Sequence, residues 1–295
     1  MKKNPFKKPA ARGSQRAKII ISGKAGVGKT VFAMQFPGVA FIDVEGSAER
    51  EWYADQLQAS GASYFGRDDG SQDIAQVINL VKWLATNKHD FKTVVIDSFS
   101  KLYSIEAARC SKLKRNGKEI GTDFGADRRE ANKQVRILFE WIDKLDMNVI
   151  LICHSKQDYL SETNETTFDG MNLMDHELDL WIEVILQGTE KRLIRVRKQR
   201  LQGFKLNEKF PLDFEAFAKK YGQQHLNASV TTIETAPEAL TGRLTALVRE
   251  AGIGQGTVDK WLQKAKVQQI TELPEDVVKS CIQYCEGRLN GTGAA

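Results

Sequence analysis

The sequence of 295 residues has no apolar run near the roughly 18 residues that a membrane-spanning helix needs, and no apolar segment of the kind that directs secretion near its first residue. We therefore expect a cytoplasmic protein without a membrane partner. The sequence has few cysteines, and none has the spacing of a metal site. In a reducing cytoplasm we expect them to remain thiols in the core. They are Cys110, Cys153, Cys281 and Cys285.

Acidic residues are absent from positions 1–18, which carry seven of the 43 Lys and Arg residues. The rest of the chain is nearly balanced, with 36 basic and 38 acidic residues, so the excess positive charge lies in this segment. We expect residues 1–17 to form a flexible basic arm, because prolines and a glycine interrupt them. Such arms often contact nucleic acid, although a tail that only interacts with water has the same composition.

The sequence contains one complete phosphate-loop motif. Residues 23–30 match G-x-x-x-x-G-K-[ST], after an apolar strand pattern at 18–22 and before a short helical pattern at 30–36. In such a loop, backbone N–H groups and a helix N-terminus point at one anion; a chance glycine-rich turn is the alternative. Lys29 would reach the β- and γ-phosphates of ATP, and the Thr30 hydroxyl would bind Mg²⁺. The expected nucleotide-binding residues are Gly23, Lys24, Ala25, Gly26, Val27, Gly28, Lys29 and Thr30.

Strand and helix patterns alternate after this loop. We expect strands at 39–45, 93–98 and 148–153, helices at 74–84 and 131–145, and a hairpin of strands at 179–186 and 192–196. Segments 46–70, 109–127 and 155–175 show no helical or strand periodicity of apolar residues. They are expected to be loops, apart from a short strand near Tyr64. This order predicts an α/β fold with a doubly wound, mostly parallel sheet and a hairpin at its edge.

The chain is expected to have four parts. They are the basic arm 1–17, a nucleotide-binding core 18–222, a threonine-rich linker 223–237 and a small helical domain 238–295. In the last part, a glycine-rich turn at 251–257 joins two helical patterns. Such a turn lets backbone N–H groups approach a DNA phosphate, but glycines also join helices that bind no ligand.

Two acids end strands beside the phosphate loop. Asp97 ends an apolar strand and would anchor Mg²⁺ together with Thr30. Ser98 follows Asp97 where many such proteins have a glutamate base, so the group that activates water must come from another strand. Glu45 is the candidate, because doubly wound sheets bind ligands at the carboxyl ends of their strands. A loop-capping acid is the alternative for Glu45.

The strands at 41–45 and 94–98 resemble the corresponding strands of the bacterial RecA recombinase family. The resemblance covers roughly residues 18–212 and implies a RecA-like P-loop fold, with Glu45 as catalytic base and Asp97 as magnesium ligand. It also implies that His154 senses the γ-phosphate, where RecA has glutamine; an ordinary polar strand end is the alternative. The core lacks RecA's flanking domains and is most similar to phage recombination proteins of the Sak group, which are single-strand annealing ATPases.

Residues 197–200 resemble the basic strand that RecA-like rings and filaments insert into a neighbour's ATP site. This resemblance implies a homo-oligomer, either filament or ring, in which Lys198 and Arg200 act on the phosphate of the adjacent subunit. The alternative is an edge strand that lysine protects against aggregation.

The basic segment 109–127 is the expected DNA-binding loop. Its cations would follow the phosphates of single-stranded DNA, together with the segment after His154, unless the loop is merely solvated. They are Arg109, Lys112, Lys114, Arg115 and Lys118.

These features indicate a DNA-dependent ATPase that promotes annealing or strand exchange in phage homologous recombination, in the host cytoplasm if a phage encodes it. A single-strand-binding protein is a candidate partner. The alternatives are a P-loop kinase of a small molecule and a DNA-loading module that uses ATP only as a switch.

Overall fold

The computed structural model describes residues 16–116, 125–158, 166–172, 174–265 and 267–290. Contacts divide the chain into two units, of which the first consists of Met1–Val81 and His89–Val230 and the second of Lys82–Lys88 and Thr231–Ala295. Most of the expected basic arm, residues 1–15, lies outside the described residues, and so does Lys118.

The first unit is built on a sheet that has nine strands in the described residues. Its parallel part has the spatial order β3 (Ser63–Phe65), β2 (Val39–Asp43), β4 (Thr93–Asp97), β5 (Asn148–Gln157), β1 (Lys18–Gly23) and β7 (Leu180–Gln187). The antiparallel strands β8 (Lys191–Gln199) and β9 (Lys209–Pro211) follow β7. The short strand β6 (Thr166–Phe168) pairs with the extended end of β5. The sheet is mostly parallel, as the sequence predicts.

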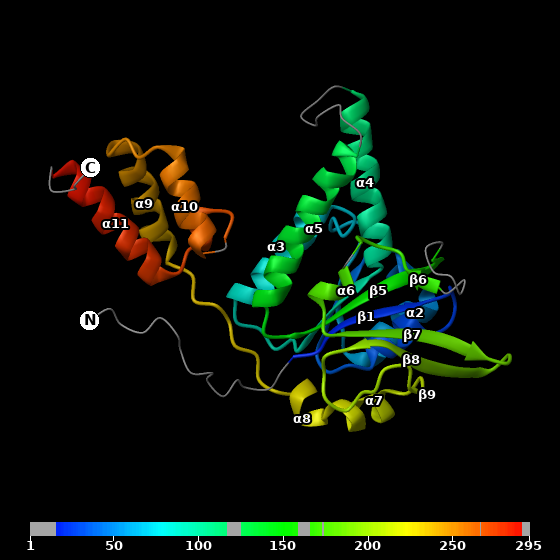
Figure 1. Ribbon diagram of the computed structural model, residues 1–295. Helices are drawn as coiled ribbons and strands as arrows, with labels where there is room; N and C mark the ends of the chain where they lie inside the picture. The colour runs from blue at the N-terminus through cyan, green and yellow to red at the C-terminus, as the bar shows by residue number, and fades with distance from the viewer. Residues whose placement is uncertain (1–15, 117–124, 159–165, 173, 266, 291–295) are drawn as a thin grey trace. The chain divides into compact units, whose positions relative to one another are not determined.

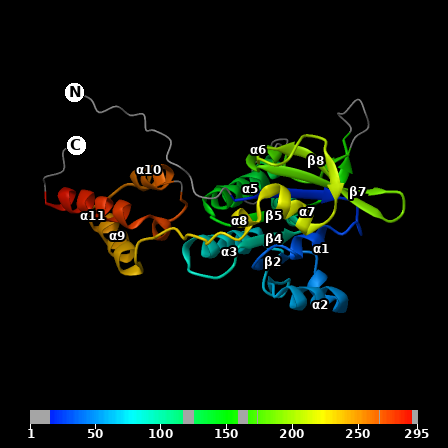
Figure 2. The same cartoon turned by 90° about the horizontal axis from the view of Figure 1, so that it is seen from below.

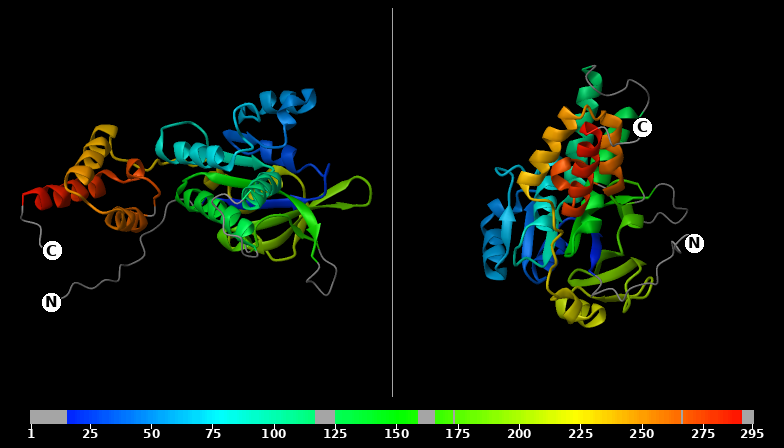
Figure 3. Two further views of the ribbon diagram at one scale, coloured as in Figure 1. Left: turned by 90° about the horizontal axis from the view of Figure 1, so that it is seen from above. Right: turned by 90° about the vertical axis from the view of Figure 1, so that its left-hand side faces the viewer.

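Helices cover both faces of this sheet (Figure 1). On one face, Ile19 and Ile21 of β1 share a core with Phe32 of helix α1 (Lys29–Met34) and Phe217 of helix α7 (Phe214–Tyr221). On the other face, α4 (Phe99–Arg115) and α5 (Ala126–Lys144) lie side by side (Figure 3). Other helices in the described residues of this unit are α2 (Glu51–Ser60), α6 (Met174–Glu177), α8 (Gln223–Leu226) and, as far as Val81, α3 (Ile74–Thr86). The α/β fold class is confirmed.

The second unit contains α9 (Glu238–Glu250), α10 (Gln255–Ala265) and α11 (Glu275–Leu289). Leu244, Val258 and Val278 are buried in its own hydrophobic core, so the C-terminal region is helical, as the sequence predicts. The glycine-rich turn joins α9 to α10, and Ile253 in this turn is buried in the same core. Nowhere in the described parts of the chain is a helix both long and apolar enough to cross a membrane.

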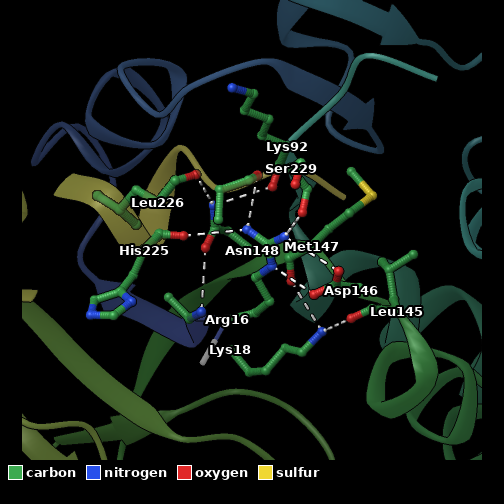
Figure 4. Close-up of polar contacts among 12 residues, drawn as sticks. Arg16, Lys18, Lys92, Leu145, Asp146, Met147, Asn148, His225, Leu226 and Ser229 are labelled. Carbon is green, nitrogen blue, oxygen red and sulfur yellow. Dashed lines mark hydrogen bonds and ion pairs between the residues drawn. The ribbon is translucent and has the colours of Figure 1, made fainter. Parts of the chain in front are cut away.

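Arg16, which the sequence analysis assigns to the flexible arm, belongs to the folded core. Its Nε donates to Asp146 Oδ1 at 2.7 Å, and its guanidinium also donates to the carbonyl oxygen of Ala228 at 3.1 Å (Figure 4). The expected linker is also wrong at its start, because 223–226 form helix α8. Leu226 is fully buried, and its carbonyl oxygen accepts a hydrogen bond from Asn148 Nδ2 at 3.0 Å.

Three expected loops contain regular structure. The segment 46–70 includes α2 as well as the expected strand β3, and part of 155–175 forms the end of β5 together with β6 and α6. The segment 109–127 is helical at both ends, because α4 continues to Arg115 and α5 begins at Ala126. The expected hairpin is present as β7 and β8, but β9 lies outside it and pairs with residues 193–195 of β8.

Candidate nucleotide site

The phosphate loop begins where β1 ends, at the carboxyl edge of the parallel strands. Gly26 and Gly28 have φ angles of 75° and 98°, in the left-handed region that glycine adopts at little cost. At Gly23, an added Cβ would lie 2.8 Å from the carbonyl oxygen of Val184 on β7. The three glycines of the motif are therefore required by the loop's own conformation and by its contact with the sheet.

Lys29 and Thr30 begin α1 directly after this loop. The Lys29 ammonium is buried and donates to the carbonyl oxygens of Gly23 at 2.9 Å and Lys24 at 2.8 Å. Burial lowers the pKa of Lys29, and the nearby Asp97 carboxylate opposes this shift. The Lys29 ammonium can bind a phosphate, because it can exchange one of these carbonyl oxygens for a phosphate oxygen.

Thr30 and Asp97 form the candidate magnesium site. Thr30 Oγ1 donates to Asp97 Oδ2 at 2.6 Å, which uses the hydroxyl proton and leaves oxygen lone pairs for a cation. Burial raises the pKa of Asp97 to about 6. In the described residues, no cluster of three or more His, Cys, Asp and Glu side chains forms a metal cage. One hydroxyl and one carboxylate beside a phosphate loop still fit Mg²⁺, which takes most of its ligands from water and phosphates.

Glu45 lies at the centre of a second polar cluster. The Ser98 hydroxyl donates to Glu45 Oε1, His154 Nε2 lies 3.3 Å from the same oxygen, and Lys101 Nζ lies 3.7 Å from Glu45 Oε2. The His154 hydrogen bond is the main cause that lowers the pKa of Glu45 to about 2, and Ser98 and Lys101 add to it against the effect of burial. The pKa of His154 is raised, chiefly by the same hydrogen bond. Glu45 is therefore a carboxylate at neutral pH and can accept a hydrogen bond from a water molecule.

The backbone beside Glu45 is fixed by two aspartates. Asp43 is buried, and its Oδ1 accepts hydrogen bonds from the backbone N–H groups of Gly46 and Ser47, both at 2.9 Å. The carbonyl oxygen of Asp97 accepts from the N–H groups of Val44 at 2.7 Å and Glu45 at 3.1 Å. Glu45 is thus held against the end of β4, where Asp97 and Ser98 follow one another.

The structure brings together the residues that the sequence analysis places on separate strands. Glu45, His154, Asp97 and the phosphate loop all lie at the carboxyl ends of neighbouring parallel strands. Asp43, Ser98 and Lys101 were missed as site residues. In the sequence, Ser98 is notable only because many such proteins have a glutamate at this position. Asp43 could have been found as a second acid near the end of the same strand as Glu45.

Comparison with known proteins identifies the family. A profile of the AAA domain matches residues 15–205, which include all of these site residues. The chain belongs to the AAA domain family. Among solved structures, it is similar to the crystal structure of the RadB recombinase, with 18% sequence identity and a TM-score of 0.45 over 68% of this chain and 90% of that chain. No curated protein matches the chain.

Lys198 and Arg200 lie away from the phosphate loop of their own AAA domain. Gly23 pairs with Val184 on β7, whereas Lys198 pairs with Trp181 nearer the amino end of that strand. Arg200 directly follows Gln199, the last residue of β8. Lys198 donates to the carbonyl oxygens of Asp175 and Leu178, and the exposed Arg200 donates to that of His176 at 2.9 Å. Lys198 is therefore partly buried and hydrogen-bonded, whereas Arg200 is exposed.

Four of the five expected DNA-binding cations lie on helix α4, where a loop was expected, and the fifth, Lys118, lies outside the described residues. Arg109 is ion-paired with the buried Glu106, and its Nη2 lies 2.6 Å from Glu106 Oε1. Lys114 Nζ lies 3.9 Å from Oδ1 of Asp127 on α5. Lys112 and Arg115 are exposed near the end of α4. The neighbouring helix α5 adds exposed cations that the sequence analysis missed. They are Arg128, Arg129, Lys133 and Arg136.

Proposed function

We propose that this AAA domain protein is a RecA-like ATPase that binds single-stranded DNA and promotes annealing or strand exchange in homologous recombination. The observation that carries the proposal is that Ser98 connects the Glu45 carboxylate to α4, a helix with basic residues in its last turn, through hydrogen bonds. The Ser98 hydroxyl donates to Glu45 and accepts from the backbone N–H of Lys101 at 3.2 Å, as the N-cap of α4. A change in the hydrogen bonds of Glu45 therefore acts on the first turn of α4.

In the proposed hydrolysis, each residue has one role. Lys29 binds the β- and γ-phosphates, and Thr30 and Asp97 hold Mg²⁺, which neutralises phosphate charge when bound. Glu45 orients a water molecule toward the γ-phosphate through a hydrogen bond to its carboxylate. Glu45 is ionised at neutral pH and fixed by Asp43 and Asp97, so it needs no proton transfer before it binds that water.

His154 is the proposed sensor of the γ-phosphate. Its imidazole contacts Glu45 and is half exposed, so an anion at the γ-phosphate position competes with Glu45 for the same N–H group. The backbone of His154 lies on β5, which continues to Gln157 and pairs there with β6. A movement of His154 can therefore reach the pairing between the end of β5 and β6.

The far end of α4 is the proposed DNA-binding surface. The helix has 17 residues and a length of about 25 Å, so its basic end lies well away from Ser98. The exposed cations near this end of α4 and the start of α5 form a surface that suits the phosphates of a single strand. Its described members are Lys112, Arg115, Arg128 and Arg129.

The positions of the phosphate loop and Arg200 support assembly into a filament or ring. Within one chain they lie at different positions along β7, since Gly23 pairs with Val184 in the middle of that strand, whereas the N–H of Arg200 donates to the carbonyl oxygen of Asp179, just before its first residue, at 2.7 Å. Two different sites of identical subunits meet across one interface when the subunits stack head to tail, which gives rings or open filaments. We propose that Arg200, with Lys198, acts on the nucleotide of the adjacent subunit.

The test is steady-state ATP hydrolysis by the full chain with and without single-stranded DNA. We expect slow turnover that DNA stimulates. Nucleotide binding without turnover in either condition would support a nucleotide-switched DNA-loading module. Phosphoryl transfer to a small molecule, unaffected by DNA, would support a kinase. A phage origin, a relation to the Sak group, a cytoplasmic location and a single-strand-binding partner are parts of the same proposal.

A further inference from the structure

The side chains of Arg192 on β8 and of Leu212, which directly follows β9, lie beside the last glycine of the phosphate loop. A Cβ built on Gly28 would lie 3.3 Å from Leu212 Cδ2, 3.7 Å from Arg192 Cδ and 4.0 Å from Arg192 Nε. Gly28 is the N-cap of α1, so these side chains lie beside the backbone that binds phosphate. Neither residue belongs to the phosphate-loop motif, and the sequence analysis assigns a role to neither.

The strand register explains why Arg192 reaches this position. Gly23 pairs with Val184 on β7, and Arg192 of β8 pairs with Leu186, two residues further toward the hairpin turn. The hairpin therefore extends past the carboxyl end of β1, alongside the loop that begins there (Figure 2). The N–H of Leu212 donates to the carbonyl oxygen of Arg192 at 3.0 Å, which holds the two residues together.

Arg192 lies at the end of a row of apolar side chains on one face of β8. Side chains alternate along a strand, so Arg192 shares a face of β8 with Ile194 and Val196. Both of these residues are fully buried in the core that includes Phe32 of α1. The row thus packs beside α1 and ends near its first turn at Arg192, which is exposed.

The sheet order fixes which end of a nucleotide Arg192 would face. Asp97 and Glu45, which serve the γ-phosphate end, follow β4 and β2 on one side of β1. Strands β7 and β8 lie on the other side of β1. A nucleotide whose γ-phosphate faces Glu45 therefore has its α-phosphate and nucleoside toward Arg192 and Leu212.

We propose that Arg192 binds the α-phosphate of the nucleotide and that Leu212 forms an apolar contact under the nucleoside. A guanidinium suits this role, because its fixed N–H groups can form two parallel hydrogen bonds to one phosphate. The α-phosphate is common to ADP and ATP, so Arg192 strengthens the binding of both equally. The proposal rests on nucleotide binding by the loop, and it requires neither hydrolysis nor DNA.

The test is calorimetric titration of the full chain with Mg·ADP and with a non-hydrolysable Mg·ATP analogue. We expect Arg192→Ala to weaken both affinities by about tenfold, which is typical of a lost hydrogen bond to a charged group. Arg192→Lys keeps the charge without the paired N–H groups and should give an intermediate loss. Lys191→Ala is the matched control, because it removes one charge from the adjacent residue, whose side chain lies on the opposite face of β8.

Unchanged ADP affinity in Arg192→Ala would overturn the proposal. A loss confined to the ATP analogue would also overturn it, because Arg192 would then face the γ-phosphate. If the wild-type chain bound neither nucleotide, both this proposal and the phosphate-loop assignment would fail. If it bound both and hydrolysed no ATP, the ATPase proposal would fail and Arg192 could still be tested. Equal thermal unfolding temperatures of the variants confirm that each is folded.

Discussion

Thr30 Oγ1 donates a hydrogen bond to Asp97 Oδ2 across 2.6 Å and so connects the first turn of α1 to the end of β4. Asp97 is 3% exposed, and its backbone carbonyl oxygen also holds the N–H groups of Val44 and Glu45. The side chain of Asp97 thus contacts the proposed magnesium site while its backbone fixes the residue proposed to orient water. We therefore expect magnesium-dependent nucleotide binding to change when Asp97 is protonated or replaced.

The first prediction concerns this carboxyl group. Because burial raises the pKa of Asp97 to about 6, the group becomes neutral as pH falls through that value, and a proton competes with Mg²⁺ for it. We expect the gain in ADP affinity from Mg²⁺ to be smaller at about pH 5 than at about pH 8, which lie on either side of this pKa. Titration of wild type and Asp97→Asn at both pH values checks this. The same pH dependence in both proteins would show that Asp97 does not hold the ion.

The second prediction concerns Glu45. Glu45→Gln removes the carboxylate that orients water and leaves the phosphate loop intact, so we expect turnover to fall about 100-fold with ADP affinity unchanged. Glu49→Gln is the control, because Glu49 is a nearby exposed acid that pairs with Arg67 and contacts no site residue that the structure describes. Lys29→Ala should lose turnover through weaker phosphate binding. Wild-type turnover in Glu45→Gln would exclude Glu45 from the reaction.

The residues of the site were predictable because they lie next to strongly patterned strands. Four buried strands have apolar runs that end at Gly23, Glu45, Asp97 and His154, and parallel strands bring those ends together. The hydrogen bonds among them were not predictable, since Ser98 and Lys101 reach Glu45 only when β4 and β2 are neighbours.

The missed helices have identifiable physical causes. The apolar face of α4 is interrupted by Glu106, a buried acid that forms an ion pair with Arg109. This ion pair is formed within the helix, and hydrophobic periodicity cannot detect it. Helix α2 buries only Leu57 among its described residues, so it has almost no periodic signal. Arg16 looked like part of a basic tail because its partner, Asp146, is 130 residues away in sequence.

The third prediction concerns the exposed cations near the end of α4. Lys112→Ala with Arg115→Ala removes two proposed phosphate contacts, so we expect weaker binding of single-stranded DNA and a smaller dependence on salt, by about one unit of slope per contact. Lys209→Ala with Lys219→Ala removes the same charge from exposed positions on β9 and α7. Fluorescence anisotropy over a range of salt concentrations compares the two pairs. Equal losses would indicate a net-charge effect without a specific surface.

The fourth prediction is that Arg200 acts between subunits. Arg200→Ala is preferable to a double substitution, because Lys198 also donates to carbonyl oxygens that precede β7, and its replacement would remove these hydrogen bonds as well. Lys29→Ala and Arg200→Ala should each be inactive alone, and a mixture should regain part of the turnover, since some interfaces pair an intact loop with an intact Arg200. A mixture that stays inactive while subunits demonstrably exchange would contradict action in trans.

The most direct test of the proposed function is the rate at which the protein anneals two complementary single strands that carry fluorescent labels. We expect the wild-type chain with Mg·ATP to accelerate annealing well above the spontaneous rate, and Lys29→Ala, which lacks the phosphate-binding ammonium, to lose most of that acceleration. Failure of the wild-type chain to accelerate annealing or strand exchange, or equal acceleration by Lys29→Ala without nucleotide, would contradict an ATP-dependent recombination function.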